Sequence, residues 1–396
     1  AISVVNVGDT SVTSGLQLNN ITLGGNPIQV LVRSPDIDPT QPFISGIFAK
    51  ADGTGNAGAI NITGTGATTS LTLNDGAQIS GSTDQGGQTA PSNITISGLN
   101  SLNATNASQI SASTNSGGAG NVSITVNQGS NPSLFLSNTA TISATAELAG
   151  GQSGGVEINA PTVVVDSGAK ISAANIDSAV GGNVTFQNLN TLQVSGTGTI
   201  EATTVDGQAG DLNVNAATAV LLDNGSLSVA ATGSGNAGTV NVTTPFLTLV
   251  NQGSITATTA SGGSVGTGNI FLQGLNTLQT NSGTTISTST DSGQAGTVSI
   301  TANQGSNPLI NLNGGTIEAA ANQAGGQAGG VVINAPTILA TNGATISASN
   351  ISSLIGGDVT LQNVNTLQVL GDSTIAATTV DGQAGDLNVN AATAVL

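Results

Sequence analysis

Two pairs of carboxylates are the first candidates for chemistry in this sequence. Asp206 and Asp211 lie on either side of a glycine-rich turn, and Asp381 and Asp386 repeat the pair further along the chain. Enzymes that cleave polysaccharides use two carboxyl groups about 5 to 9 Å apart. In most of the corresponding turns the second acid is replaced by Asn or Thr, so the non-catalytic interpretation is that these are ordinary turn acids.

A second acidic group lies in a proline-rich segment, where Asp36 and Asp38 have only Arg33 nearby. The chain has no His, Cys or Tyr and only three cations, so general acid–base catalysis has few participants. We therefore expect no catalytic residues and interpret the chain as a non-enzyme. A polysaccharide-cleaving enzyme is the remote alternative.

Calcium is the next chemistry to consider, because Gly-Gly-x-Gly-x-Asp repeats bind Ca²⁺ between coils. The stretch "SGGAGNVS" resembles half of such a repeat but carries Asn in place of the acid. Other acids adjoin turns without recurring at one site in consecutive repeats: Asp166, Asp177, Asp223 and Asp291. We expect no metal and no cofactor.

A carbohydrate site usually needs an aromatic platform, and the chain has no Trp or Tyr. Phe271 in "NIFLQ" is a candidate for an outward-facing ring that could bind a sugar. The alternative is that it is an exposed residue with no binding role.

Composition and charge exclude several classes of protein. Of 396 residues, 20 are acidic, and the only cations are Arg33, Lys50 and Lys170, which gives a net charge of −17. No basic patch is available for nucleic acid. No run approaches the roughly 18 apolar residues of a membrane span. The hydrophobic content of 37% is enough for a folded chain, and the lack of Cys suits export.

The chain contains a long internal duplication. The stretch "VDGQAGDLNVNAATAVL" occurs at 205–221 and again at 380–396, so each position of the second copy is numbered 175 higher than its counterpart. The same shift relates the two copies of "INAPT" and the two copies of "NTLQV". We assign the duplicated halves to residues of about 46–220 and 221–396.

A shorter period of roughly 28 to 32 residues lies inside the duplication, within the range that is typical of solenoid repeats. A glycine-rich turn followed by alternating aliphatic residues recurs twelve times, and seven of the eleven spacings are 28. The first aliphatic residue of each repeat is Ile60, Ile94, Val122, Val156, Val184, Leu212, Val240, Ile270, Val298, Val331, Val359 or Leu387.

Each repeat then offers a second and a third alternating run, such as "TVVVD" and "AKISAAN". Alternation with a period of two, bounded by Gly, Asn, Asp and Ser, is typical of short strands with one buried face. The main aliphatic residue of the third run is Ile79, Ile110, Ile142, Ile171, Ile200, Leu227, Ile255, Ile286, Ile317, Ile346 or Ile375. The pattern predicts an all-β parallel β-helix (β-solenoid) over residues 44–396, with three strands per coil, about 12 coils and three parallel sheets around a narrow core.

Prolines support this register. Proline has no backbone N–H to donate to a neighbouring strand, and a residue at a corner between strands does not need one. Five of them are predicted to lie just before the second strand of a coil: Pro132, Pro161, Pro245, Pro308 and Pro336.

Residues 1–43 lack the glycine spacing. The stretches "ISVVNV" and "IQVLVR" indicate strands, and a loop with three prolines follows them. We predict an irregular β segment that either caps the first coil or docks onto another molecule.

The stretches "SGIFAKADGTGNAGAINIT", "LTLNDGAQISGST" and "SGGAGNVSIT" resemble the repeats of filamentous-haemagglutinin-like exoproteins of the cyanobacterial type. The likeness covers about residues 44–396. It implies a right-handed β-helix exported by a two-partner route, and a role as an adhesin or surface fibre.

The last repeat stops part-way at Leu396, although its first copy continues. Either the sequence is a segment of a longer exoprotein, or the open coil edge pairs with another chain. We expect an extracellular or cell-surface structural protein that forms the shaft of a fibre or matrix filament by end-to-end self-association, with cell-surface or glycan contact as a further expectation. The alternative is an adhesin stalk that carries a binding tip outside this segment.

Overall fold

The computed structural model describes residues 16–18, 46–51, 57–83, 92–115, 117–148, 151–176, 181–261, 268–351 and 356–395. The chain divides into two compact units, unit 1 (Ala1–Leu189 with Thr197–Glu201) and unit 2 (Asn190–Gly196 with Ala202–Leu396). Of the predicted segment 1–43, only Leu16–Leu18 is described. Arg33, Asp36, Asp38 and Asp177 also lie outside the described residues.

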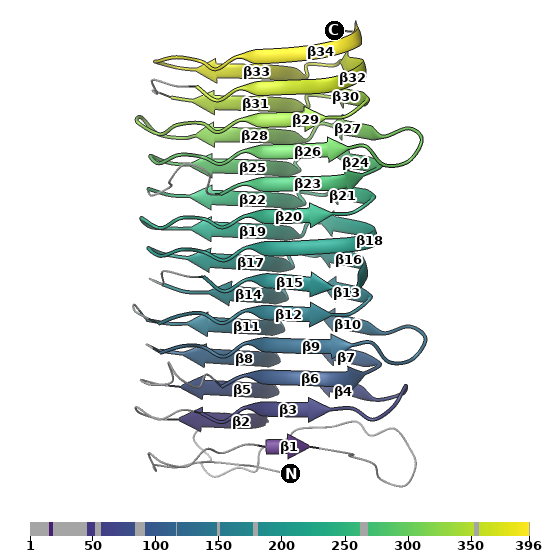
Figure 1. Cartoon of the computed structure of the whole chain (residues 1–396), viewed down its shortest axis with the longest axis vertical. Helices are drawn as coiled ribbons and strands as arrows, with labels where there is room; N and C mark the ends of the chain where they lie inside the picture. The colour runs from purple at the N-terminus through teal and green to yellow at the C-terminus, as the bar shows by residue number, and fades with distance from the viewer. Residues whose placement is uncertain are drawn as a thin grey trace. The chain divides into compact units, whose positions relative to one another are not determined.

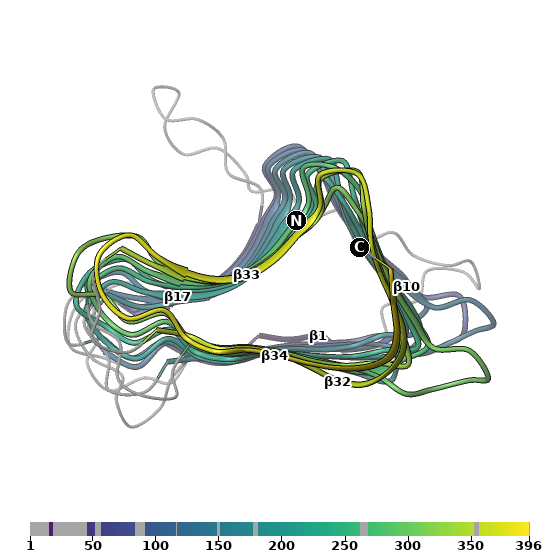
Figure 2. The same cartoon turned by 90° about the horizontal axis from the view of Figure 1, so that it is seen from above.

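Every regular element among the described residues is a β-strand. A typical coil of unit 1 consists of three strands in chain order: β9 (Val122–Val126), β10 (Ser133–Leu136) and β11 (Thr141–Ala146). We call strands in these three places of a coil first-position, second-position and third-position strands. Each of these strands pairs in parallel with its counterpart in the next coil, for example Ile142 with Ile171. The coils of each unit turn in the right-handed sense along the chain (Figures 1 and 2). The predicted right-handed parallel β-solenoid is therefore confirmed.

The strands of unit 1 follow this plan from β1 onward. Their bounds are β1 (Leu16–Leu18), β2 (Gly46–Ala51), β3 (Ile60–Thr63), β4 (Ser70–Leu73), β5 (Gln78–Thr83), β6 (Ile94–Leu99), β7 (Ser101–Ala104), β8 (Gln109–Thr114), β12 (Val156–Asn159), β13 (Thr162–Val165), β14 (Lys170–Ala174) and β15 (Val184–Gln187). Two further strands contain residues of both units: β16 (Leu189–Ser195) and β17 (Thr199–Thr204).

Unit 2 continues with the same three strand positions. Its strands are β18 (Leu212–Asp223), β19 (Ser226–Ala231), β20 (Val240–Thr243), β21 (Phe246–Val250), β22 (Ser254–Thr259), β23 (Ile270–Leu275), β24 (Thr277–Thr280), β25 (Thr285–Thr290), β26 (Val298–Ala302), β27 (Leu309–Asn313), β28 (Thr316–Ala321), β29 (Val331–Asn334), β30 (Thr337–Thr341), β31 (Thr345–Asn350), β32 (Val359–Val369), β33 (Thr374–Thr379) and β34 (Leu387–Val395).

The predicted register is confirmed in detail. Each of the twelve aliphatic residues assigned to the start of a repeat is the first residue of a strand, and each of the five prolines immediately precedes a second-position strand. Within the described ranges, twelve strands occupy the third position, which matches the expected number of coils. Isoleucines stack in register along these strands, as Ile255, Ile286 and Ile317 do in unit 2.

The number of sheets differs from the predicted three. In unit 2 the first-position and second-position strands belong to one hydrogen-bonded sheet, and the third-position strands form the other. The first two positions are joined because β18, β32 and β34 each run through the first corner without a break. The corner reads "NAATAV" in β18 and β34 and "QNVNTL" in β32, with no proline and no glycine in either case, so the chain can stay extended there.

The core of each unit lies between the strand positions and is aliphatic. Inward residues alternate with outward ones, as in β11, where Ile142, Ala144 and Ala146 are at most 1% exposed. Large and small side chains alternate along the third-position strands, which suits a narrow interior. Of the residues described, no helix is long and apolar enough to cross a membrane.

The turn into the first strand is built on a row of glycines, here called the glycine row, of which Gly120, Gly154 and Gly238 are members. A Cβ on Gly154 would overlap the carbonyl oxygen of Gly120 in the preceding coil. The backbones of successive coils approach too closely here for any side chain. At Gly120, Gly154 and Gly238, glycine is therefore required by the spacing between coils, and φ at these three residues is not in the left-handed region.

Candidate functional site

Asp206 lies in the turn between β17 and β18, where its side chain is held by the next coil. The backbone N–H and the hydroxyl of Ser234 both donate to Asp206 Oδ1, at 2.8 and 3.0 Å. These two hydrogen bonds lower the pKa of Asp206 below its usual range, and burial opposes them only weakly. A general acid in glycoside cleavage needs a raised pKa. The environment of Asp206 therefore favours the opposite protonation state, the carboxylate.

Asp211 lies directly before β18 and binds a different partner from Asp206. Its Oδ1 accepts the backbone N–H of Thr239 in the next coil, at 2.8 Å. In the duplicated pair, Asp381 donates its backbone N–H to the Ile351 carbonyl, and Asp386 donates its backbone N–H to Asp358 Oδ1. The carboxylates of the first pair thus have structural partners in neighbouring coils.

The contact of Asp211 belongs to a row of Asn and Asp side chains, here called the Asx ladder, which occupies the residue before the first-position strands. In each case the side-chain oxygen accepts the backbone N–H of the same position in the next coil, at 2.7 to 2.8 Å. The members with this bond are Asn93, Asn121, Asp211, Asn269 and Asp358. The Asn in "SGGAGNVS", which stands where a calcium repeat has an acid, is Asn121 of this ladder.

The acids considered for calcium lie apart. Asp166 accepts a hydrogen bond from the Ser167 hydroxyl, and Asp223 accepts one from Asn251 Nδ2, both at corners that precede a third-position strand. Asp291 follows a third-position strand, where its backbone N–H donates to the Ala260 carbonyl. Across the described ranges, no group of three or more His, Cys, Asp or Glu is placed to hold a metal ion.

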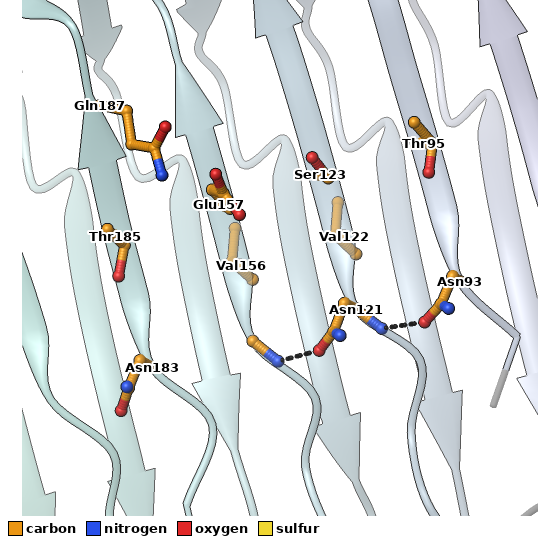
Figure 3. Close-up of a pocket in the computed structure, with 11 residues that line it drawn as sticks. Asn93, Thr95, Asn121, Val122, Ser123, Val156, Glu157, Asn183, Thr185 and Gln187 are labelled. Carbon is orange, nitrogen blue, oxygen red and sulfur yellow. Dashed lines mark hydrogen bonds between the residues drawn. The ribbon is translucent and has the colours of Figure 1, made fainter. Parts of the chain in front are cut away.

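A groove lies on the outer face of the first-position strands in unit 1 (Figure 3). It has a volume of about 510 Å³ and crosses β6, β9, β12 and β15. We call it groove 1 and define it by Asn93, Asn121, Ser123, Gly155, Glu157 and Thr185. Its volume lies within the range of about 300 to 1,000 Å³ that is usual for small-molecule sites.

The hollow exists because the Asx ladder is interrupted. Asn121 and Asn183 lie one coil before and one coil after Gly155, which has no side chain to fill the space between them. Glu157 lies beside this gap on the outer face, in register with Ser123 on one side and Thr185 on the other. Figure 3 shows these side chains in two parallel rows that run across the strands.

The orientation of two amides in groove 1 is fixed by chemistry. Asn93 Oδ1 accepts the N–H of Asn121, and Asn121 Oδ1 accepts the N–H of Gly155, both at 2.8 Å. A backbone N–H can donate only to the oxygen of an amide, so the assignment of oxygen and nitrogen is unambiguous. The Nδ2 donors must then lie on the opposite side of each amide.

Unit 2 contains a groove at the corresponding place, with a volume of about 420 Å³. We call it groove 2 and define it by Asn269, Thr297, Gly330, Val332, Asp358 and Thr360. The shift of the internal duplication relates Gly155 to Gly330 and Thr185 to Thr360, while Glu157 corresponds to Val332. Both grooves therefore lie where glycine interrupts the Asx ladder.

Phe271 is on the outer side of β23, as considered from the sequence, and is half-buried. It pairs in register with Asn241 and Ser299. Its ring therefore belongs to the same outer face as groove 2, and one strand, β26, separates it from the strand that carries Val332.

Sequence reasoning missed both grooves and one ion pair. The grooves could have been found from two sites where Gly-Gly is followed directly by Val, at 154–156 and 329–331, in place of Gly and then Asn, Asp or Thr. On the outer face of the third-position strands in unit 1, Lys170 Nζ lies 2.5 Å from Glu201 Oε1, which also accepts the Ser172 hydroxyl. No spacing in the sequence distinguishes this pair from other surface residues.

No family model, curated protein or solved structure matches the chain.

Proposed function

We propose that this protein is an extracellular structural protein that forms the shaft of a surface fibre or matrix filament. Its work is mechanical, with coils stacked along the axis of the fibre, and it has no catalytic role. The same proposal includes end-to-end association of copies and a location outside the cell.

The single observation that carries the proposal is the continuity of the ladders within each unit. Side chains of the same kind lie over one another in successive coils, as Ile110, Ile142 and Ile171 do in unit 1. Each coil contacts only its neighbours, so length grows with the number of repeats while the cross-section stays constant. In-register strands around a dry aliphatic core resist solvent and proteases. These are the properties that a fibre shaft needs.

The acids support a structural role as well. Asp206 and Asp211 bind groups of the next coil, and these contacts hold coils together. A carboxylate that fixes backbone geometry is poorly placed for proton transfer, because its oxygen is already engaged.

Electron microscopy of the purified protein over a range of concentrations tests the proposal. End-to-end association predicts filaments of variable length that grow as concentration rises. Particles of one fixed length at all concentrations would favour the adhesin stalk instead. Separate compact particles with no elongation would contradict both.

A deletion of residues 1–42 separates the two roles predicted for that segment. If the segment docks onto the next copy, the shortened chain gives only short particles under conditions in which the full chain forms filaments. If it is a cap, filaments persist. The β-sheet spectrum in circular dichroism should be unchanged by the deletion and serves as the control for folding.

A further inference from the structure

We propose that groove 1 and groove 2 each bind a strand of a neutral polysaccharide, which lies across the β-strands and along the stacking direction of the coils. This binding is independent of filament formation, because each groove lies on the lateral face of a single unit.

The first argument is the supply of fixed hydrogen-bond donors. In groove 1, Asn93 and Asn121 have their oxygens engaged by backbone N–H groups, so their Nδ2 donors are held in place. They belong to adjacent coils and are therefore spaced at about the 4.8 Å of neighbouring strands, which is the scale of one sugar ring. Donors that are held in advance lose little entropy when a ligand binds.

The second argument is the acceptor at the centre of the groove. Glu157 is exposed between Ser123 and Thr185, whose side chains are only partly buried. A carboxylate beside hydroxyl groups can accept hydrogen bonds from the hydroxyls of a sugar, and the Ser and Thr side chains can either donate or accept. Asp358 and Thr360 line groove 2, and Asp358 Oδ1 accepts the backbone N–H of Asp386.

The third argument is charge. None of the described residues that line either groove is cationic, and each groove carries one carboxylate. Sulfated or phosphorylated ligands would be repelled. A neutral, hydroxyl-rich chain satisfies the donors and acceptors without an unpaired charge. Val332 and the outward Phe271 on the same face add apolar surface near groove 2, against which a sugar ring can pack.

The fourth argument is recurrence. The two hollows arise from the same local change, a glycine in the Asx ladder, at equivalent positions of the two duplicated halves. Neighbouring coils have Asn, Asp or Thr at this position, so the structure tolerates a side chain there. Each groove is thus a place where the chain lacks a side chain that the fold can accommodate, and this occurs once in each duplicated half.

The missing side chain supplies the test. Gly155→Asn and Gly330→Asn restore the ladder and fill the grooves. A Cβ at Gly155 would lie 3.2 Å from the Asn183 carbonyl oxygen, and one at Gly330 would lie 3.4 Å from the Asp358 carbonyl oxygen, so little or no adjustment is needed. Glu157→Gln keeps the shape of groove 1 and removes its charge. Glu147→Gln, at an exposed acid after β11, is the matched control.

Isothermal titration calorimetry on the full chain uses cellohexaose, xylohexaose, mannohexaose and laminarihexaose as neutral probes, with sulfated dextran and calcium chloride as comparisons. We expect at least one neutral hexasaccharide to bind two sites per chain. Each single Gly→Asn variant should bind one, and the double variant none. Glu157→Gln should weaken groove 1 by about tenfold, the loss expected when a charged acceptor is replaced by a neutral amide. Glu147→Gln should leave binding unchanged.

Four results would overturn the proposal: no heat with any of the four hexasaccharides, full binding by a folded double variant, tighter binding of sulfated dextran than of the neutral probes, or a requirement for Ca²⁺. Thermal unfolding of each variant shows whether it is folded. If the glycine variants fail to fold, Glu157→Gln still decides the case for groove 1. Filament length in the microscope is measured separately, so failure here leaves the proposed shaft untouched.

Discussion

Buried threonines fix the turns that follow three of the third-position strands, β8, β17 and β25. Thr114, Thr204 and Thr290 are at most 2% exposed, and in each case the Oγ1 atom accepts the N–H of the glycine three residues later, at 2.9 to 3.1 Å. The hydroxyl lies inside an aliphatic core and is satisfied by this bond to the turn. The link between the core and the turn thus depends on one polar atom in each of these coils.

Replacement of Thr204 by Val tests this link. The variant keeps the shape of the side chain but leaves the N–H of Gly207 without its acceptor, and we expect a loss of about 1 kcal/mol in the free energy of unfolding. Thr203→Val, one residue earlier on the outer side of the same strand, is the control and should change stability by less than about 0.5 kcal/mol. Urea unfolding of both variants measures the difference. Equal effects would mean that the buried hydrogen bond contributes nothing specific.

The lowered pKa of Asp206 predicts a pH dependence. Because the folded-state pKa is below the unfolded value of about 3.9, the contact with Ser234 stabilises the fold above that pH and is lost as pH falls through the folded pKa. Asp206→Asn should therefore lower the melting temperature more at pH 7 than at pH 2. Ser234→Ala, which removes the hydroxyl donor and keeps the N–H, should raise the pKa of Asp206 part of the way in an NMR titration. The same pKa in both proteins would contradict the role of the hydroxyl.

At the scale of elements, the glycine row sets how closely two coils can approach. Gly154→Ala would place a methyl group on the Gly120 carbonyl oxygen, and the neighbour is backbone that cannot rotate away. We expect a loss of about 3 kcal/mol, the upper end for overpacked sites. Gly66→Ala, also in unit 1, meets nothing within 4 Å and should be neutral or slightly stabilising. Thermal unfolding compares them, and similar melting temperatures would show that the coils can separate at low cost.

The Asx ladder gives a second prediction at this scale. Asp211→Ala leaves the N–H of Thr239 without its acceptor, whereas Asp211→Asn keeps an oxygen in the same place. We expect a loss of about 1 kcal/mol for the alanine variant and almost none for asparagine, measured by urea unfolding. A large loss for Asp211→Asn would mean that the negative charge matters, and would reopen the interpretation of Asp206 and Asp211 as a working pair of carboxylates.

The strands could be predicted from the sequence because their signals are local. Alternation marks the buried face, and a proline such as Pro161 marks a corner, so the starts of the twelve first-position strands and of the five second-position strands that follow a proline are correct. The continuous strand β18 was not predicted. A proline marks a corner clearly, whereas a segment such as "NAATAV", which lacks a corner residue, gives no comparable signal that the strand continues.

The grooves were missed because their signal is also not local. Gly155 looks like any other glycine of a turn until the coils are stacked and its neighbours in space are Asn121 and Asn183.

At the scale of the whole molecule, the net charge bears on the proposed association of copies. With a net charge of −17 at pH 7, two copies repel one another, and the repulsion is screened by salt. The isoelectric point is near 4.1, so protonation of the carboxylates removes the repulsion as pH falls toward that value. We therefore expect association of copies to accelerate between pH 7 and about pH 4, and also on addition of salt at pH 7.

Static light scattering at fixed protein concentration measures this association, and electron microscopy shows whether the product is filamentous. Repulsion between like-charged copies does not depend on which surfaces meet. Filaments at pH 4.5 with the same diameter as those at pH 7 would therefore mean that charge controls only the rate of association. The geometry of the filament would then be determined by the stacked coils. Amorphous aggregates at the lower pH would instead mean that charge is what prevents non-specific contact, and that the coil edges do not direct assembly. Scattering that is independent of both pH and salt would contradict the electrostatic account.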